Sequence, residues 1–163
     1  MRSRTYGELS TEEMVEKIYQ YYMENKIYEC PFEIVIGTDS QNFSDTKIVK
    51  VVCVLCVGHG GIYFYDVSRV NRINDVRVKL NKETALSLDL ANEVMQIMEG
   101  NSKYEELYLN AHFAIHVDAG NSSSGKTKDL IPSIVGWVHA CGYDCVVKPD
   151  SFAASSVADR LSK

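Results

Sequence analysis

The order of the predicted secondary-structure elements indicates a mixed α/β fold, with a sheet of five strands and an additional helix at the N-terminus. Two observations carry this prediction. Three β-rich segments follow one another between residues 32 and 67, as in an antiparallel meander, and helical and strand-like segments alternate after them. Strands that alternate with helices pair in parallel, so the second half of the sheet is expected to hold the parallel pairs. The expected order is one helix followed by β-β-β-α-β-α-β-α.

The first helix is predicted over residues 11–25 by the pattern at its N-terminus. Ser10 stands at the cap position and Glu13 follows three residues later, which is the spacing of a capping box. Leu9 and Met14 are placed to form a hydrophobic staple across this cap. Apolar side chains then recur at helical spacing, so one face of the helix is expected to pack on a core.

The remaining elements follow from periodicity and from turn residues. Strands are predicted for the short apolar or β-branched runs at residues 32–39, 48–57, 62–67, 107–118 and 143–147. Helices are predicted for the segments at residues 82–99, 128–141 and 151–163. The glycine-rich residues 58–61 predict a hairpin turn between the second and third strands. Residues 68–81 are expected to form an irregular, basic connection.

Length and composition predict a single globular domain. The chain has 163 residues, of which 45% are hydrophobic and 24% are charged, as in ordinary globular proteins rather than disordered or low-complexity chains. We therefore expect one domain over residues 1–163, with residues 1–30 as an N-terminal helical extension. The formal net charge of −5 argues against non-specific coating of a phosphate backbone. Any contact with nucleic acid must depend on a local basic patch or on bound cations.

The apolar runs and the cysteines predict a cytoplasmic protein without a membrane segment. The longest purely apolar run covers residues 51–57, far short of the ~20 residues that a membrane-spanning helix needs. The N-terminus leads into polar sequence and carries no apolar stretch typical of a signal peptide. Five cysteines are an odd number and do not fit a framework of disulfides, so we expect reduced thiols.

Two aspartates stand at the ends of predicted strands. Asp39 ends the first strand and Asp118 ends the fourth. If these strands are parallel neighbours, both carboxylates lie at the carboxyl edge of the sheet, where α/β proteins place their ligand sites. The alternative is that each aspartate simply caps a turn, because Asp is common where a strand stops.

Two further acids lie on predicted helices. Glu83 stands at the head of the apolar stripe of the 82–99 helix, which directs it toward the sheet. Its alternative role is a favourable charge in the first helical turn behind an Asn81 cap. Asp159 lies in the last helix among small serine side chains, and its alternative is an exposed residue beside Arg160.

Four acids from two strands and two helices could converge on a pair of divalent cations. Carboxylate oxygens suit hard cations such as Mg²⁺ and Mn²⁺, and two such ions can activate water and stabilise the leaving oxygen of a phosphodiester. Without cations the acids would repel one another, so a shared site gives a physical reason for their placement. The candidate catalytic and metal-binding residues are Asp39, Glu83, Asp118 and Asp159.

Four stretches of the sequence match the motifs of a known family. They are residues 36–41 (IGTDSQ), residues 116–120 (HVDAG), residues 136–138 (GWV) with Gly142 and Tyr143, and the Lys148-Pro149 pair with residues 153–160 (AASSVADR). In these stretches the chain resembles the YkuK family of small bacterial proteins within the ribonuclease H-like superfamily. The resemblance implies a ribonuclease H-like fold, Mg²⁺ or Mn²⁺ as cofactor, and a hydrolase of the nuclease type. It also implies that the four acids named above take the positions of the superfamily's metal ligands.

A basic segment precedes Glu83 and is the candidate contact for nucleic acid. Its cationic side chains are Arg69, Arg72, Arg77 and Lys79. Positive charge that leads into the acids could guide a phosphate backbone toward them. The alternative is an ordinary solvated loop.

A rival motif lies at residues 120–127, which satisfy the G-x-x-x-x-G-K-[ST] pattern of a phosphate-binding loop. Only 36 residues follow Thr127, too few for the further parallel strands of such a domain, and a helix that began at Gly125 would contain Pro132. A plain turn of small residues is the simpler interpretation.

The sequence therefore predicts a divalent-metal-dependent nuclease that hydrolyses phosphodiester bonds, with RNA, DNA or a hybrid as substrate. The alternatives are a non-catalytic module of the same fold that binds nucleic acid or protein, and a nucleotide-binding phosphate loop.

Overall fold

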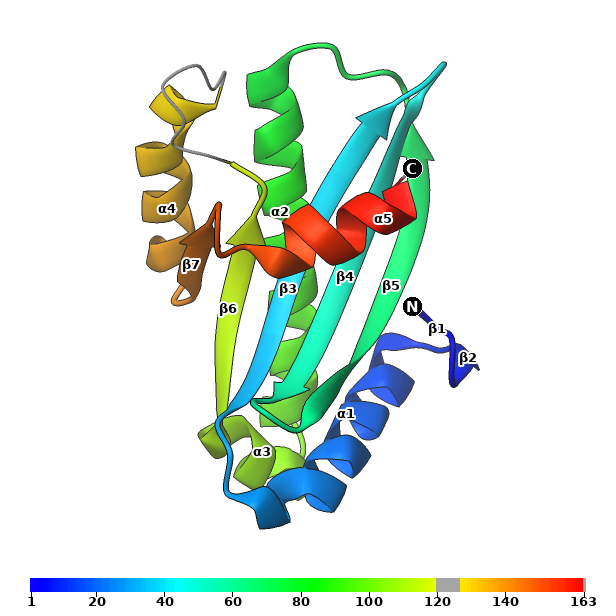
Figure 1. The fold of residues 1–163 in the computed structure, drawn as a ribbon, viewed down its shortest axis with the longest axis vertical. Helices are drawn as coiled ribbons and strands as arrows, with labels where there is room; N and C mark the ends of the chain where they lie inside the picture. The colour runs from blue at the N-terminus through cyan, green and yellow to red at the C-terminus, as the bar shows by residue number, and fades with distance from the viewer. Residues whose placement is uncertain (120–126, 163) are drawn as a thin grey trace.

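A computed structural model of the protein describes residues 1–119 and 127–162, without the side chains of residues 154, 155, 159 and 162. The described residues form a seven-stranded sheet in the order β2-β1-β5-β4-β3-β6-β7 (Figure 1). The strands are β1 (Arg2–Ser3), β2 (Gly7–Glu8), β3 (Phe32–Asn42), β4 (Thr46–Cys56), β5 (Gly60–Val70), β6 (Ala111–Val117) and β7 (Asp144–Val147). The predicted α/β class is confirmed. The expected count of five strands is wrong, because two short N-terminal strands extend the sheet beyond β5.

The strand pairing has an antiparallel half and a parallel half. β4 pairs antiparallel with both β3 and β5, which is the predicted meander. β6 pairs parallel with both β3 and β7, as expected for the second half of the sheet. The prediction that the first strand stops at Asp39 is wrong, because β3 continues antiparallel to β4 as far as Asn42. Its parallel pairing with β6 does end at Thr38, opposite Val117.

The four predicted helices form, most of them with shifted ends, but the prediction of a strand over the whole of residues 107–118 is wrong, because residues 105–110 are helical and the strand begins at Ala111. The helices are α1 (Thr11–Asn25), η1 (Lys26–Tyr28), α2 (Val76–Glu99), η2 (Ser102–Tyr104), α3 (Glu105–Asn110), η3 (Lys128–Leu130), α4 (Ile131–Ala140), the π-helical η4 (Ala153–Ala158) and α5 (Asp159–Ser162). The capping box of α1 forms as predicted, with both the Ser10 and the Glu13 side chains bonded to backbone amides. α2 begins six residues before the predicted start, because Asp75 caps it by accepting from the Val78 amide.

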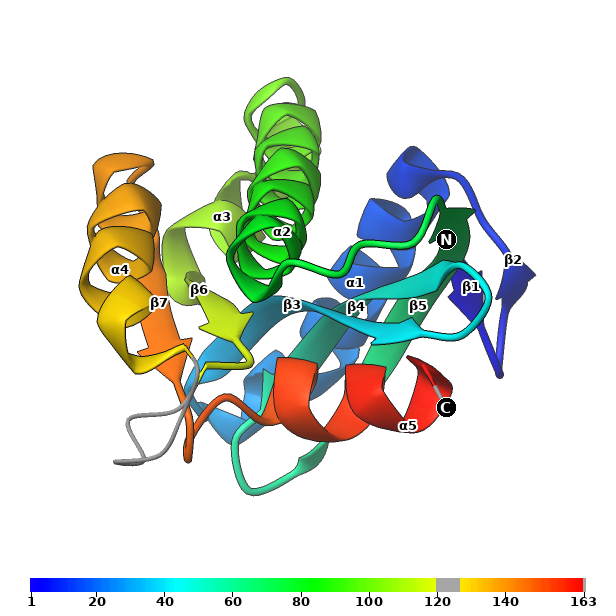
Figure 2. The same ribbon diagram turned by 90° about the horizontal axis from the view of Figure 1, so that it is seen from above.

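The helices divide unequally between the two faces of the sheet. α1, α2, α3 and α4 lie on one face, and of the described helices only those of the C-terminal segment, which ends in α5, cross the other (Figure 2). We call the buried cluster on the first face the main core; it contains 26 buried residues of the described chain, Ile18 of α1 and Ile34 of β3 among them. The cluster on the other face, the second core, contains six: Val35, Val49, Val51, Cys53, Ala153 and Ala158.

One pair of cysteines contradicts the expectation of reduced thiols. Cys30 and Cys56 form a disulfide, with their Cα atoms 5.8 Å apart. The pairing arises because Cys56 ends β4 opposite Phe32 of β3, only two residues beyond Cys30. Cys53, Cys141 and Cys145 are free. Within residues 1–119 and 127–162, no helix has both the length and the apolar character needed to cross a bilayer.

Candidate active site at the carboxyl ends of β3 and β6

Three of the four predicted acids line one pocket. The pocket has a volume of about 160 Å³ and is bordered by Asp39, Val76, Lys79, Leu80, Glu83, Asp118 and Thr127. Asp39 comes from β3, Glu83 from α2, and Asp118 directly follows β6. The structure therefore brings together carboxylates from segments that are far apart in the sequence.

The parallel register between β3 and β6 sets two of these acids at the same level. Thr38 pairs with Val117, so Asp39 and Asp118 are the next residues of two neighbouring parallel chains. Alternate residues of a strand share a face, and Asp39 lies opposite Val49, which belongs to the second core. Glu83, by contrast, is supplied by a helix of the main-core face. The pocket lies where the two faces meet at the end of the strands.

Glu83 is the most deeply placed of the three acids. Its residue is only 8% exposed, and its Oε1 accepts a hydrogen bond from the Ser40 hydroxyl at 2.6 Å. Burial is the main cause that raises the pKa of Glu83 to about 7, and the charges of Asp39 and Asp118 raise it further. The Ser40 hydrogen bond and the Lys79 charge oppose this shift. The metal-free site therefore contains a carboxyl group that is readily protonated near neutral pH.

The alternative role of Glu83 as a charge in the first helical turn is wrong. α2 begins at Val76, so Glu83 lies two turns inside the helix and faces the sheet. Ser87 follows one turn later on the same side and its hydroxyl lies 2.8 Å from that of Thr38. This buried polar strip was missed in the sequence, although a Glu and a Ser at i and i+4 within an apolar stripe are a usable signal.

Asp118 has a cationic partner that the sequence pattern did not predict. The Lys148 ammonium lies 2.7 Å from the Asp118 Oδ1. Lys148 follows β7, and its backbone amide donates to the Ala119 carbonyl at 3.0 Å. The β6–β7 pairing therefore places Lys148 beside the candidate site. The Lys148-Pro149 pair was noted in the sequence only as a family motif.

Asp159 stands at the first position of α5, and its side chain lies outside the described residues. The backbone of the C-terminal segment is held against the second face, because η4 contacts β3, β4 and β6 and α5 contacts β3 and β4. His116 of β6 anchors this segment. Its Nδ1 accepts from the Ala153 amide at 3.2 Å and its ring meets that of Phe152 edge to face at 4.7 Å. Burial lowers the pKa of His116 to about 4, so the imidazole is neutral at pH 7.

The four basic residues predicted to contact nucleic acid lie in different surroundings. Arg69 forms an ion pair with Asp45 at 2.7 Å, and Arg72 donates to the Phe43 carbonyl at 2.6 Å, so both hold the connection between β3 and β4. Arg77 is exposed in the first turn of α2. Only Lys79 reaches the pocket of the acids. The phosphate-loop motif falls almost entirely on residues 120–126, outside the described residues, and Thr127 lines the pocket.

The three acids suit a divalent cation by chemistry but are not arranged as a ready cage. Among the described side chains, no group of three or more His, Cys, Asp or Glu could hold an ion as they stand. Their hard oxygen donors are those preferred by Mg²⁺ and Mn²⁺. Glu83 accepts one hydrogen bond from Ser40, and Asp118 forms an ion pair with Lys148, so an ion at Asp118 Oδ1 would have to displace the Lys148 ammonium.

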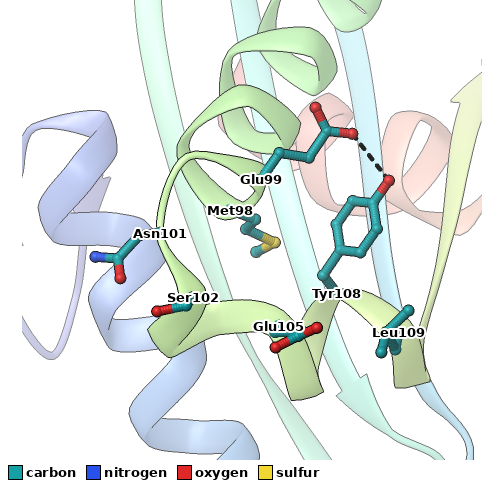
Figure 3. A pocket seen from close by; sticks show the side chains of 7 residues that line it. All are labelled: Met98, Glu99, Asn101, Ser102, Glu105, Tyr108 and Leu109. Carbon is teal, nitrogen blue, oxygen red and sulfur yellow. Dashed lines mark hydrogen bonds between the residues drawn. The ribbon is translucent and has the colours of Figure 1, made fainter.

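A larger pocket lies at the opposite end of α2 and contains none of the predicted residues. Figure 3 shows its lining, about 370 Å³ in volume, formed by Met98, Glu99, Asn101, Ser102, Glu105, Tyr108 and Leu109. The Tyr108 hydroxyl donates to Glu99 across it at 2.8 Å. Glu99 and Glu83 are 16 residues apart on one helix, about 24 Å at the α-helical rise. Two acidic and no basic side chains make this pocket unsuited to a phosphate.

The fold and the placement of the acids define a ribonuclease H-like protein. The profile of the family described as "Ribonuclease H-like" matches residues 13–163, and the chain belongs to this family. A relative is the "Uncharacterized protein YkuK" of Bacillus subtilis (strain 168), which is 28% identical over 164 residues, covering 96% of this chain and 93% of that protein. The resemblance drawn from the sequence motifs is confirmed.

Two solved structures show weaker similarity. The N-terminal RNase H domain of Rv2228c from Mycobacterium tuberculosis, solved as a fusion with maltose binding protein, is 14% identical with a TM-score of 0.33, covering 80% of this chain and 93% of that one. The catalytic domain of Mos1 transposase, in a structure with Raltegravir and Mg, is 12% identical with a TM-score of 0.31, covering 91% of this chain and 66% of that one.

Proposed function

We propose that the protein is a divalent-metal-dependent nuclease that hydrolyses phosphodiester bonds in nucleic acid. The observation that carries the proposal is the convergence of Asp39, Glu83 and Asp118 on one pocket at the carboxyl ends of parallel strands. Burial and the two neighbouring acids raise the pKa of Glu83, which is the electrostatic state expected of a cation site without its cation.

Each acid has a distinct part in this proposal. Asp39 and Asp118 stand at one level and would hold the ions together with Glu83 from the main-core side. Asp159 of α5 would complete the set of ligands. Two bound divalent ions would supply water activation and stabilisation of the leaving oxygen. Ser40 orients the Glu83 carboxylate through its 2.6 Å hydrogen bond.

The charge distribution restricts how a nucleic acid is held. The net charge of −5 does not favour broad contact with phosphates. Among the described residues, Lys79 is the basic residue that lines the pocket, and Arg77 is exposed two residues before it on α2. We therefore propose a short contact with few phosphates, in which Lys79 and the bound ions supply the positive charge.

Calorimetric titration with Mn²⁺ tests the site. We expect the wild-type protein to bind Mn²⁺, and Asp39→Asn and Asp118→Asn each to lower the affinity at least about tenfold, since even outer-shell changes cost that much. Asp89→Asn is the matched control, because Asp89 is an exposed acid on α2 and its loss leaves the affinity unchanged. Equal Mn²⁺ binding in the wild type and both site variants would refute the metal site.

Hydrolysis is tested on a panel of single-stranded and duplex RNA and DNA and an RNA–DNA hybrid. We expect cleavage of at least one substrate in Mg²⁺ or Mn²⁺ and none in EDTA, with loss in Asp39→Asn but not in Asp89→Asn. The Lys148–Asp118 ion pair favours one alternative, a non-catalytic module in which a lysine replaces the ion. That module predicts nucleic-acid binding that survives Asp39→Asn, with no cleavage of any substrate.

A further inference from the structure

The ion pair between Lys148 and Asp118 has the least exposed carboxylate of the ion pairs in the described residues. The side chain of Asp118 is 21% exposed, whereas that of Lys148 is 46% exposed. The acidic partners in the other pairs range from 31% to 78% exposed. The attraction between two charges strengthens as they are removed from water. The Lys148–Asp118 pair is therefore expected to be stronger than ion pairs with a more exposed carboxylate.

The backbone, and not the side chain alone, sets the position of this lysine. Val147 pairs with Val117 in the parallel β6–β7 ladder, and the next amide, that of Lys148, donates to the Ala119 carbonyl. The start of the Lys148 side chain is therefore fixed beside Asp118. The ammonium stands on a flexible four-carbon stem and is half exposed, so it can turn into solvent while these backbone bonds persist.

A lysine and a divalent ion compete for the same carboxylate oxygen. The Lys148 ammonium lies 2.7 Å from Asp118 Oδ1, and an ion within coordination distance of that oxygen would occupy the same space. A divalent ion carries twice the charge of an ammonium and interacts with Asp39 and Glu83 as well, so it is the stronger partner once it is present. Its positive charge would also repel the ammonium.

We propose that Lys148 is an internal cation that occupies Asp118 in the metal-free protein and is released into solvent when a divalent ion binds. This inference rests on the proposed function and adds a regulatory part to the same site. Lys148 protects the acids from mutual repulsion before the metal arrives, and it sets the concentration at which the metal binds.

Mn²⁺ calorimetry of Lys148 variants tests the competition. We expect Lys148→Met to bind Mn²⁺ about fivefold more tightly than the wild type. Removal of a competing, partly exposed ion pair changes an affinity by up to about this factor. Lys148→Arg retains the charge and is expected to bind no more tightly than the wild type. Lys82→Met removes an exposed cation of α2 that does not line the pocket, so we expect at most about a twofold change.

A second measurement uses the wild-type protein and does not depend on a variant that folds. Lysines are acetylated with an amine-reactive ester, and the modification at each site is measured by mass spectrometry with and without Mn²⁺. We expect acetylation of Lys148 to rise at least about twofold when Mn²⁺ is added, because the ion pair that shields the amine is lost. Lys26 is the matched control: it pairs with Glu106 at the far end of the molecule, and its acetylation stays unchanged.

The outcomes separate this inference from the proposed function. If the wild type binds Mn²⁺ but Lys148→Met binds it equally well and Lys148 acetylation does not change, the competition is refuted and the metal site stands. If Lys82→Met tightens binding as much as Lys148→Met, the effect is one of general charge and the competition is again refuted. If neither the wild type nor Lys148→Met binds Mn²⁺, both proposals fall.

Discussion

More buried residues pack on one face of the sheet than on the other, and the proposed site includes residues from both faces. On one face, four helices enclose the main core of 26 buried residues of the described chain. On the other, a single C-terminal segment covers the six-residue second core. Glu83 projects from α2 on the first face, whereas Asp159 lies on the C-terminal segment. The proposed set of ligands thus includes one acid on the heavily packed α2 and another on the thinly covered C-terminal segment.

This difference has a consequence for how the site assembles. Local opening occurs first where few apolar side chains are buried, so the C-terminal segment is expected to open before α2. Glu83 and the strand ends are then held rigidly, whereas the proposed ligand Asp159 depends on the seating of the C-terminal segment. Three experiments test whether the two faces differ in this way.

The largest expected effect concerns the burial of Glu83 against the main core. The pKa of Glu83 is raised to about 7 from its ordinary value of 4.5. Between these two pH values Glu83 is protonated in the folded state and ionised in the unfolded state. The stability that this proton provides is fully present below pH 4.5 and is lost as the pH rises through 7. In EDTA we expect the free energy of unfolding to fall by an amount on the order of 3 kcal/mol over this range.

Urea unfolding of the wild type and Glu83→Gln across pH 5 to 8 measures this effect. The glutamine variant lacks the titrating carboxyl group, so the difference between the two curves cancels the contribution of other groups such as His116. Saturating Mn²⁺ should remove the fall in the wild type, because a cation favours the ionised carboxylate. Parallel pH curves for the two proteins would show that Glu83 is not held in a desolvated site.

A matched pair of neighbouring valines compares the two cores directly. Val51 and Val52 of β4 are both 0% exposed, and they point to the second core and the main core respectively. We expect Val52→Ala to lower the free energy of unfolding by about 2–3 kcal/mol, because the enclosed core cannot collapse around the cavity. Val51→Ala should cost about 1 kcal/mol less, since the C-terminal segment can adjust. Equal losses in urea unfolding would mean that both faces are equally rigid.

The smallest expected effect on global stability comes from the anchor of the C-terminal segment. His116→Leu leaves the buried Ala153 amide without its acceptor, which costs about 1–2 kcal/mol. This hydrogen bond holds the C-terminal segment on the second face. We therefore expect amide hydrogen exchange to become faster in residues 152–162, while the amides of α2 remain protected from exchange. His112→Leu is the control, because His112 is exposed on the same strand and contacts Asp144. Uniform acceleration across both regions would contradict separate opening of the C-terminal segment.

The features that depend on residues close together in the chain could be predicted from the sequence. The capping box of Ser10 and Glu13, the three-stranded meander and the alternation that leads to parallel pairing were all predicted, because hydrophobic period and turn residues act over a few positions. The placement of Asp39 and Asp118 at one sheet edge followed from the same pattern. Helix and strand ends were less accurate: the Asp75 cap went unnoticed, so the start of α2 was placed six residues late.

The contacts between charged side chains and between cysteines depend on the three-dimensional fold and could not be predicted from the sequence. Lys148 reaches Asp118, Arg69 and Arg72 turn to the connection between β3 and β4, and Cys30 joins Cys56. No local pattern marks these contacts, since each joins segments brought together by strand register or by a loop that returns to the sheet. An ion pair or a disulfide depends on positions in space to within a few tenths of an ångström, whereas hydrophobic period specifies only which side of an element is buried.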